Sequence, residues 1–194
     1  RVEADGAQHI WNMTGGLNFS SGGQLLGNST NSATGYHWEW GHTNVTASNP
    51  TSDAVISGRI RLRVDAVQPT FTVADGAAAN DLLISAAITQ SGGGGSITKA
   101  GAGTLTLSGV NSYTGATTVN GGTLKAGSTT AFGSNSAVSL ANTAGVVLDL
   151  AGFNNTIGSL AGGGASGGNV TLGSATLTTG GNNTSTSHAG VISG

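Results

Sequence analysis

The residues best suited to chemistry in this chain gather in one short stretch, His37 to His42. Imidazole and carboxylate groups bind zinc, so His37, Glu39 and His42 are candidate metal ligands. In a regular strand His42 points away from His37, and no fourth ligand follows, so no metal is expected. Trp38 and Trp40 share the face opposite to that of His37 and Glu39. They suit stacking on a sugar ring, or a lid over the open end of a stack of strands, and the lid is favoured.

A basic stripe forms the second candidate site. Arg59, Arg61 and Arg63 alternate with Ile60, Leu62 and Val64, which predicts a strand with one charged and one apolar face. The arginines suit an acidic polysaccharide or a phosphate. A solvated face balanced by nearby carboxylates is favoured over that binding site. The carboxylates in question are Asp53, Asp65 and Asp75.

Evidence for catalysis or for a bound cofactor is missing from the sequence. Acid–base catalysis needs two positioned carboxylates, and residues 100–194 contain only Asp149. Serine and histidine occur without a nucleophile elbow. The chain has no cysteine, which excludes disulfides, thiol catalysis and thiolate metal sites. We therefore expect no enzyme and no cofactor.

The composition favours a folded, turn-rich, all-β chain. Glycine supplies 35 of 194 residues, and charged residues make up 7% where about 25% is usual. Twelve of the 14 charged residues lie in 1–99. The apolar fraction of 37% and the net charge of −2 argue against disorder. A chain this weakly charged has no general attraction for nucleic acid, so no nucleic-acid partner is expected.

Short apolar-alternating runs bounded by glycine predict many short strands joined by tight turns. Thr104–Leu107, Thr117–Val119 and Gly122–Lys125 follow this pattern, and Leu82–Ile88 is expected to form another strand. Strands this short need stacked neighbours to bury their apolar side. The pattern recurs at Leu105, Leu124 and Leu148. This recurrence predicts a parallel β-solenoid with coils of about 19–25 residues and a narrow Leu, Val and Ile core.

One segment resembles a known family. Lys99 to Leu124 reads KAGAGTLTLSGVNSYTGATTVNGGTL and is similar to the autotransporter-associated β-strand repeat of bacterial surface proteins. The resemblance implies a right-handed parallel β-helix, export to the cell surface, and no catalysis by the repeat itself. The positions that carry the motif are Gly101, Gly103, Leu105, Leu107, Gly109, Tyr113, Gly115, Val119, Gly122 and Leu124.

The sequence divides into a front part and a more regular back part. Residues 1–54 are expected to form an irregular, cap-like region, and 55–194 the solenoid, with the recognisable repeat at 97–194. No signal peptide or apolar span of about 20 residues is present, so we expect a mature product or an excised piece of a longer protein. The resemblance implies that it is extracellular or located at the bacterial cell surface. Membrane contact is expected only through a translocator that this chain lacks.

Three functions remain open at this point. The first is a non-catalytic structural segment, acting as a rigid stalk, spacer or adhesin passenger. The second is a filament subunit that associates head to tail through its strand edges. The third is a glycan-binding module that uses Trp38, Trp40, His37 and Glu39. The partners considered, besides a second copy of the chain, are a host or matrix glycan or protein.

Overall fold

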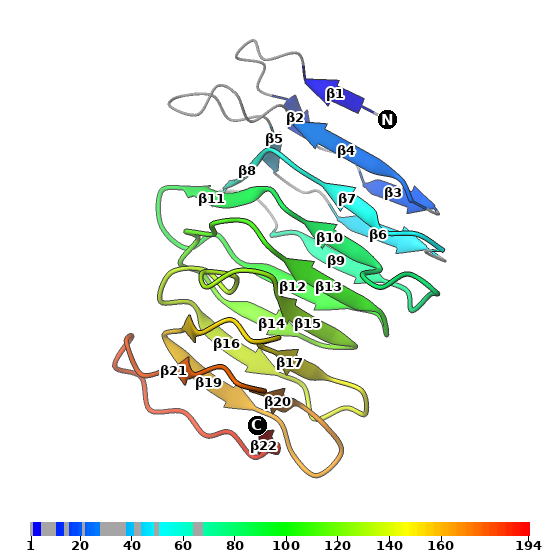
Figure 1. Cartoon of the computed structure of the whole chain (residues 1–194). Coiled ribbons are helices and arrows are strands. Elements are labelled where there is room, and N and C mark those ends of the chain that lie inside the picture. Colours follow the sequence, from blue (N-terminus) through cyan, green and yellow to red (C-terminus); the bar gives the residue numbers. More distant parts are fainter. Residues whose placement is uncertain are drawn as a thin grey trace.

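The computed structural model describes residues 2–4, 11–13, 16–20, 22–27, 38–40, 44–48, 51–63 and 68–194. All regular structure in these ranges is β. The paired strands run parallel and stack on one another, so that the sheets extend along the long axis of the molecule (Figure 1). The predicted all-β parallel solenoid is confirmed. Val and Thr favour such short strands because branched side chains pack well on a pleated surface.

Three long sheets, called A, B and C here, and one small sheet D make up the described fold. Sheet A contains β1 (Val2–Ala4), β4 (Gln24–Gly27), β7 (Ala54–Ile56), β10 (Leu82–Ile84), β13 (Thr104–Leu107), β15 (Thr123–Ala126), β17 (Val147–Asp149), β20 (Asn169–Thr171) and β22 (Ile192–Ser193). Sheet C contains β3 (Leu17–Ser20), β6 (Val45–Ser48), β9 (Thr70–Val73), β12 (Ile97–Ala100), β14 (Thr117–Val119), β16 (Ala137–Leu140) and β19 (Ser159–Gly162). Sheet B contains β2 (Trp11–Met13), β5 (Trp38–Trp40), β8 (Arg59–Arg63) and β11 (Ala87–Ser91), and sheet D contains β18 (Asn155–Thr156) and β21 (Leu177–Thr178).

Each early coil passes through sheets B, C and A in turn, and sheet B ends at β11. The next two coils have strands only in sheets C and A, before β18 begins sheet D. Their remaining stretches, 108–116 and 127–136, are loops and turns. The third face of the solenoid therefore changes along its length, from strand to loop and back to strand.

Coil length matches the prediction in the second half of the chain and exceeds it earlier. In sheet A, Leu105 is paired with both Leu82 and Leu124, one coil away on either side, as the predicted spacing requires. The earlier coils, from Leu25 to Ile56 and from Ile56 to Ile84, are longer than predicted. The extra length of the coil that ends at Ile84 includes the loop 74–81, where the next coil turns within 101–103.

The core is a column of inward side chains that follows the stacking direction. In sheet A each coil places an apolar residue over the one before: Ala54, Leu82, Leu105, Leu124, Leu148 and Val170, all buried. Burying a leucine or valine side chain contributes about 1.5–3 kcal/mol. Stacking therefore supplies the burial that no three- or four-residue strand achieves alone.

One expectation about the strands needs correction. The single strand expected at Leu82–Ile88 is wrong, because the chain turns at Ser85 and Ala86 and passes from β10 in sheet A to β11 in sheet B. Both amides of this turn donate to the carbonyl of Ile56, at 2.9 and 3.1 Å. Thr106, on the outward side of β13, is buried, and its hydroxyl donates to the side chain of Asn80 at 2.6 Å.

The motif glycines lie where one coil rests on the backbone of the coil before it. Gly101, Gly103, Gly109, Gly115 and Gly122 each leave no room for a Cβ atom. A Cβ at Gly109, for example, would overlap the carbonyl oxygen of Ala86. Glycine is required here by close backbone approach, and at Gly101 also by a φ of 78°.

Gly109→Ala should lower the free energy of unfolding by about 1–3 kcal/mol, because the backbone of the preceding coil cannot move aside without strain. The matched control is Gly93→Ala, where nothing lies within 4 Å of the added atom. Urea unfolding followed by circular dichroism measures both changes. Equal stability of the two variants would contradict the stacking constraint.

Candidate functional site

The two tryptophans proposed for sugar binding lie inside the solenoid. Trp38 and Trp40 in β5 are 0% and 1% exposed. The indole Nε1 of Trp38 donates to the Ser57 carbonyl at 3.1 Å, and the Trp40 ring lies 5.8 Å from that of Phe71. Strand β5 pairs on both sides, with β2 and β8, so these residues do not cover an open end. Their shared face is correct, but it is the core face.

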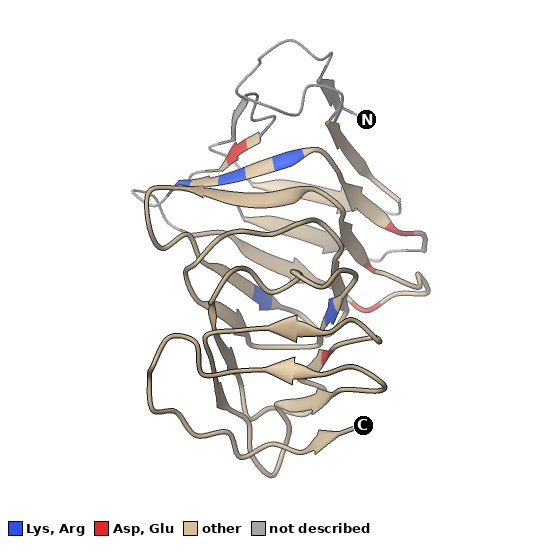
Figure 2. Ribbon diagram, turned by 60° about the vertical axis from the view of Figure 1, so that its left-hand side comes forward, with Lys and Arg blue, Asp and Glu red and all other residues tan. Residues whose placement is uncertain are grey.

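The outward side of the same sheet carries the basic stripe (Figure 2). Arg59, Arg61 and Arg63 are half-buried, while Ile60 and Leu62 point into the core, as predicted. Arg61 Nη1 donates to Glu39 Oε1 at 3.0 Å, a partly exposed ion pair of modest strength.

The aspartates expected to balance the stripe lie elsewhere or outside the described residues. Asp53 accepts hydrogen bonds from the backbone amide and the side-chain amide of Asn80, at 3.1 and 2.9 Å, beside the sheet A strands. Asp75 is exposed, and Asp65 lies outside the described residues. Glu39 supplies one balancing charge, through its ion pair with Arg61.

The proposed metal ligands His37 and His42 also lie outside the described residues. Within the described ranges, no three side chains of His, Cys, Asp or Glu gather in a way that would hold a metal ion. Glu39 is thus accounted for by its pairing with Arg61.

Trp38→Ala should lower the free energy of unfolding by about 3–5 kcal/mol, because it removes one of the two large, fully buried indole side chains of β5. Glu39→Gln, on the outward side of the same strand, should change it by about 1 kcal/mol or less. Thermal unfolding compares them. A Trp38→Ala protein as stable as Glu39→Gln would contradict the burial of Trp38 in the core.

A buried lysine closes the corner between sheets C and A. Lys99 follows the inward parity of Ile97 and is 1% exposed. Its Nζ donates to three carbonyl oxygens where β12 and β14 end. These belong to Ala100 at 2.9 Å, Gly101 at 2.8 Å and Gly121 at 2.9 Å. The side chain therefore serves the fold and is not presented to a ligand.

Burial and a nearby carboxylate act in opposite directions on Lys99. Burial lowers its pKa from 10.5 to about 8, while the charge of Asp81 opposes that shift. Asp81 is itself buried and accepts from the amides of Gly76 at 3.0 Å and Thr104 at 2.7 Å. The sequence analysis did not predict the pairing of Lys99 with Asp81. Period-two alternation does place Lys99 on the same side of the strand as Ile97.

The lysine predicts a specific pH dependence of stability. Its folded-state pKa lies below the unfolded value, so the unfolded chain binds the proton more strongly between about pH 8 and 10.5, and stability rises with pH there. Relative to Lys99→Met, the wild-type protein should gain about 2 kcal/mol between about pH 7.5 and 9.5. Urea titrations across that range measure the gain, with Lys125→Met as the control. Parallel pH curves for wild type and Lys99→Met would contradict the buried charge.

A buried series of hydrogen bonds involves two further motif residues, Tyr113 and Gly115. Tyr113 Oη bonds Thr117 Oγ1 at 2.8 Å, Thr117 bonds Ser136 Oγ at 3.0 Å, and Ser136 donates to the Gly115 carbonyl at 2.6 Å. Complete burial raises the pKa of Tyr113 above its ordinary value, which keeps the phenol neutral. These hydroxyls satisfy one another and the backbone, so Tyr113 acts as a core residue.

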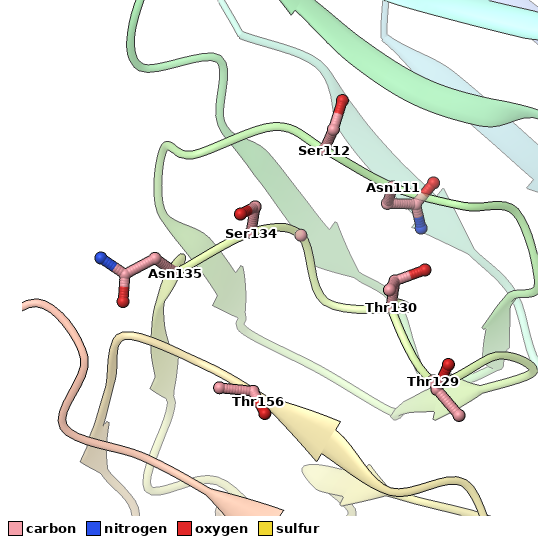
Figure 3. A pocket seen from close by; sticks show the side chains of 8 residues that line it. Asn111, Ser112, Thr129, Thr130, Ser134, Asn135 and Thr156 are labelled. Carbon is pink, nitrogen blue, oxygen red and sulfur yellow. The ribbon is translucent and has the colours of Figure 1, made fainter.

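An open polar hollow of about 450 Å³ lies on the face where strands are interrupted (Figure 3). It is bordered by the loop between β13 and β14, the loop between β15 and β16, and β18. Its lining residues are Asn111, Ser112, Thr129, Thr130, Gly133, Ser134, Asn135 and Thr156, none of which carries a charge. The sequence analysis did not single out this group.

Parts of the chain match a family model and a curated protein. Residues 97–126 match the model of the family described as passenger-associated-transport-repeat. The chain is 50% identical over 129 residues to the adhesin BmaC autotransporter of Brucella suis biovar 1 (strain 1330). That alignment covers 64% of this chain and 4% of the relative. No solved structure matches the chain.

The parallel solenoid and the matched repeat define the class: residues 97–126 are an autotransporter passenger repeat. The chain is part of an exported protein and is extracellular or located at the bacterial cell surface. Over the described ranges, no helix is both long and apolar enough for a membrane span. The chain spans about 4% of the length of the curated relative.

Proposed function

We propose that this chain is a non-catalytic structural segment of an adhesin-type passenger and acts as a rigid spacer at the cell surface. The observation that carries the proposal is the unbroken stack of coils in sheet A, from β1 to β22. Because each coil pairs with its neighbours, bending the stack would break backbone hydrogen bonds and open the apolar column.

The use made of buried titratable groups supports the same proposal. Lys99 donates to three backbone carbonyls, Asp81 accepts from two backbone amides, and Tyr113 bonds a buried threonine. A catalytic acid, base or nucleophile needs an accessible partner in a cleft. These three groups instead hydrogen-bond to the backbone or to a buried side chain and so stabilise turns and loops, as expected of a structural segment.

The similarity to a known adhesin supports the proposal that this chain belongs to an adhesin-type passenger. The relative with 50% identity is named as an adhesin autotransporter, and the matched family is a passenger repeat. A solenoid of this kind extends by about 4.8 Å for each coil. Each added coil therefore carries other parts of a passenger further outward on a stacked, hydrogen-bonded support.

The spacer proposal is tested by limited trypsin digestion of the folded chain. The two tryptic sites of the repeat region, Lys99 and Lys125, lie within β12 and β15, so native digestion should leave both bonds intact. The same chain in urea should be cut at both, which serves as the control. Native cleavage at these sites as fast as in urea would contradict a rigid stack.

A further inference from the structure

The polar hollow has a set of side chains with unused hydrogen-bonding capacity. Six of its lining side chains are exposed, and in the described chain none of them has a hydrogen-bond partner. They are Ser112, Thr129, Thr130, Ser134, Asn135 and Thr156. Outside the hollow, side chains such as Ser128, Ser136 and Asn155 bond the backbone, as does Asn111 in its lining.

The backbone below these side chains is firmly fixed. Asn111 accepts from the Ile88 amide at 2.9 Å and donates to the Ala131 carbonyl at 2.7 Å. The Ala131 amide in turn donates to Asn155 at 3.0 Å. The loop between β15 and β16 is therefore held between asparagines from the coils on either side of it.

Two further contacts anchor the same loop. Phe132 is fully buried in the core, and the Ser134 amide donates to the Tyr113 carbonyl at 2.8 Å. The exposed hydroxyls thus stand on an ordered frame and need little reorganisation to meet a ligand. Such preorganisation lowers the entropic cost of binding.

The chemistry of the lining selects the class of ligand. Serine and threonine hydroxyls both donate and accept, and the asparagine amide does both through separate atoms. Lys125 and Asp149, the charged residues of 100–194, lie in sheet A and do not line the hollow. A hydroxyl-rich, uncharged ligand matches this set, whereas a phosphate or a carboxylate would find no cation.

We propose that the hollow binds a neutral saccharide segment, with Ser112, Thr130 and Ser134 as its principal hydrogen-bonding side chains. Figure 3 shows these residues on two neighbouring coils, with Thr156 contributed by a third. The volume of about 450 Å³ lies in the range of small-molecule sites. Because the hollow is open and has no exposed aromatic platform in its lining, single-site binding should be weak, with a Kd of about 1 mM.

The test is a titration of the folded, ¹⁵N-labelled chain with maltotriose, cellotriose and chitotriose, and with trigalacturonate as an acidic probe. A neutral probe should shift the amide resonances of 111–112, 129–135 and 156. The triple variant Ser112→Ala, Thr130→Ala, Ser134→Ala should weaken that binding at least about tenfold, because three hydrogen bonds are removed. The matched control is Thr72→Ala, Ser139→Ala, Thr171→Ala, three exposed positions in strands β9, β16 and β20, which should leave the affinity unchanged.

Three results would overturn the proposal: no shift with any neutral probe up to its solubility limit, shifts that map elsewhere on the molecule, or preferred binding of trigalacturonate. Thermal unfolding of both triple variants separates lost binding from lost folding. The spacer proposal does not depend on this outcome, since trypsin resistance is measured without a saccharide.

Discussion

The rest of the structure depends on one constraint: each coil lies with its backbone directly on the backbone of the coil before it. Coil-to-coil hydrogen bonds such as that from the Asn120 amide to the Lys99 carbonyl, at 2.8 Å, hold the stack together. The same closeness removes the space for a side chain at Gly109 and the other motif glycines. High glycine content, which alone would suggest flexibility, here allows a tightly packed rod. The apolar column in sheet A follows, because strands in register place leucine over leucine.

The constraint also explains why polar groups are buried in an otherwise apolar column. A sharp corner leaves carbonyl oxygens without strand partners, and an unpaired buried carbonyl costs about 1–3 kcal/mol. Lys99 meets this need between sheets C and A, and Asn111 meets it where sheet B is interrupted. The side chains at these corners are buried and hydrogen-bonded to the backbone, whereas six exposed side chains of the polar hollow have no hydrogen-bond partner in the described chain. The first group serves the fold, and the second is the one proposed to bind a saccharide.

Period-two alternation predicted much of the fold. It placed Leu105 and Leu107 inward and Arg59, Arg61 and Arg63 outward, because side chains of a strand alternate regardless of context. It did not say which side of β5 faces the core, so it leaves sugar stacking and the favoured lid over an open end as the roles of the tryptophans, although both are buried within the stack. Nor did it show the turn at Ser85 and Ala86, which is fixed by bonds to the preceding coil. The polar hollow had no local signal, since it arises where loops from separate coils meet.

The register of the stack is tested most directly by pairs of engineered cysteines in this cysteine-free chain. Thr98 and Thr118 are direct neighbours in sheet C, and Ser139 pairs with Thr118 one coil further on. Adjacent strands lie about 4.8 Å apart, within disulfide range, whereas two coils span more than about 7 Å. We predict that mild oxidation joins Thr98→Cys to Thr118→Cys but not Thr98→Cys to Ser139→Cys, as measured by mass spectrometry of the peptides. Efficient joining of the second pair, or failure of the first, would contradict the stacked parallel solenoid.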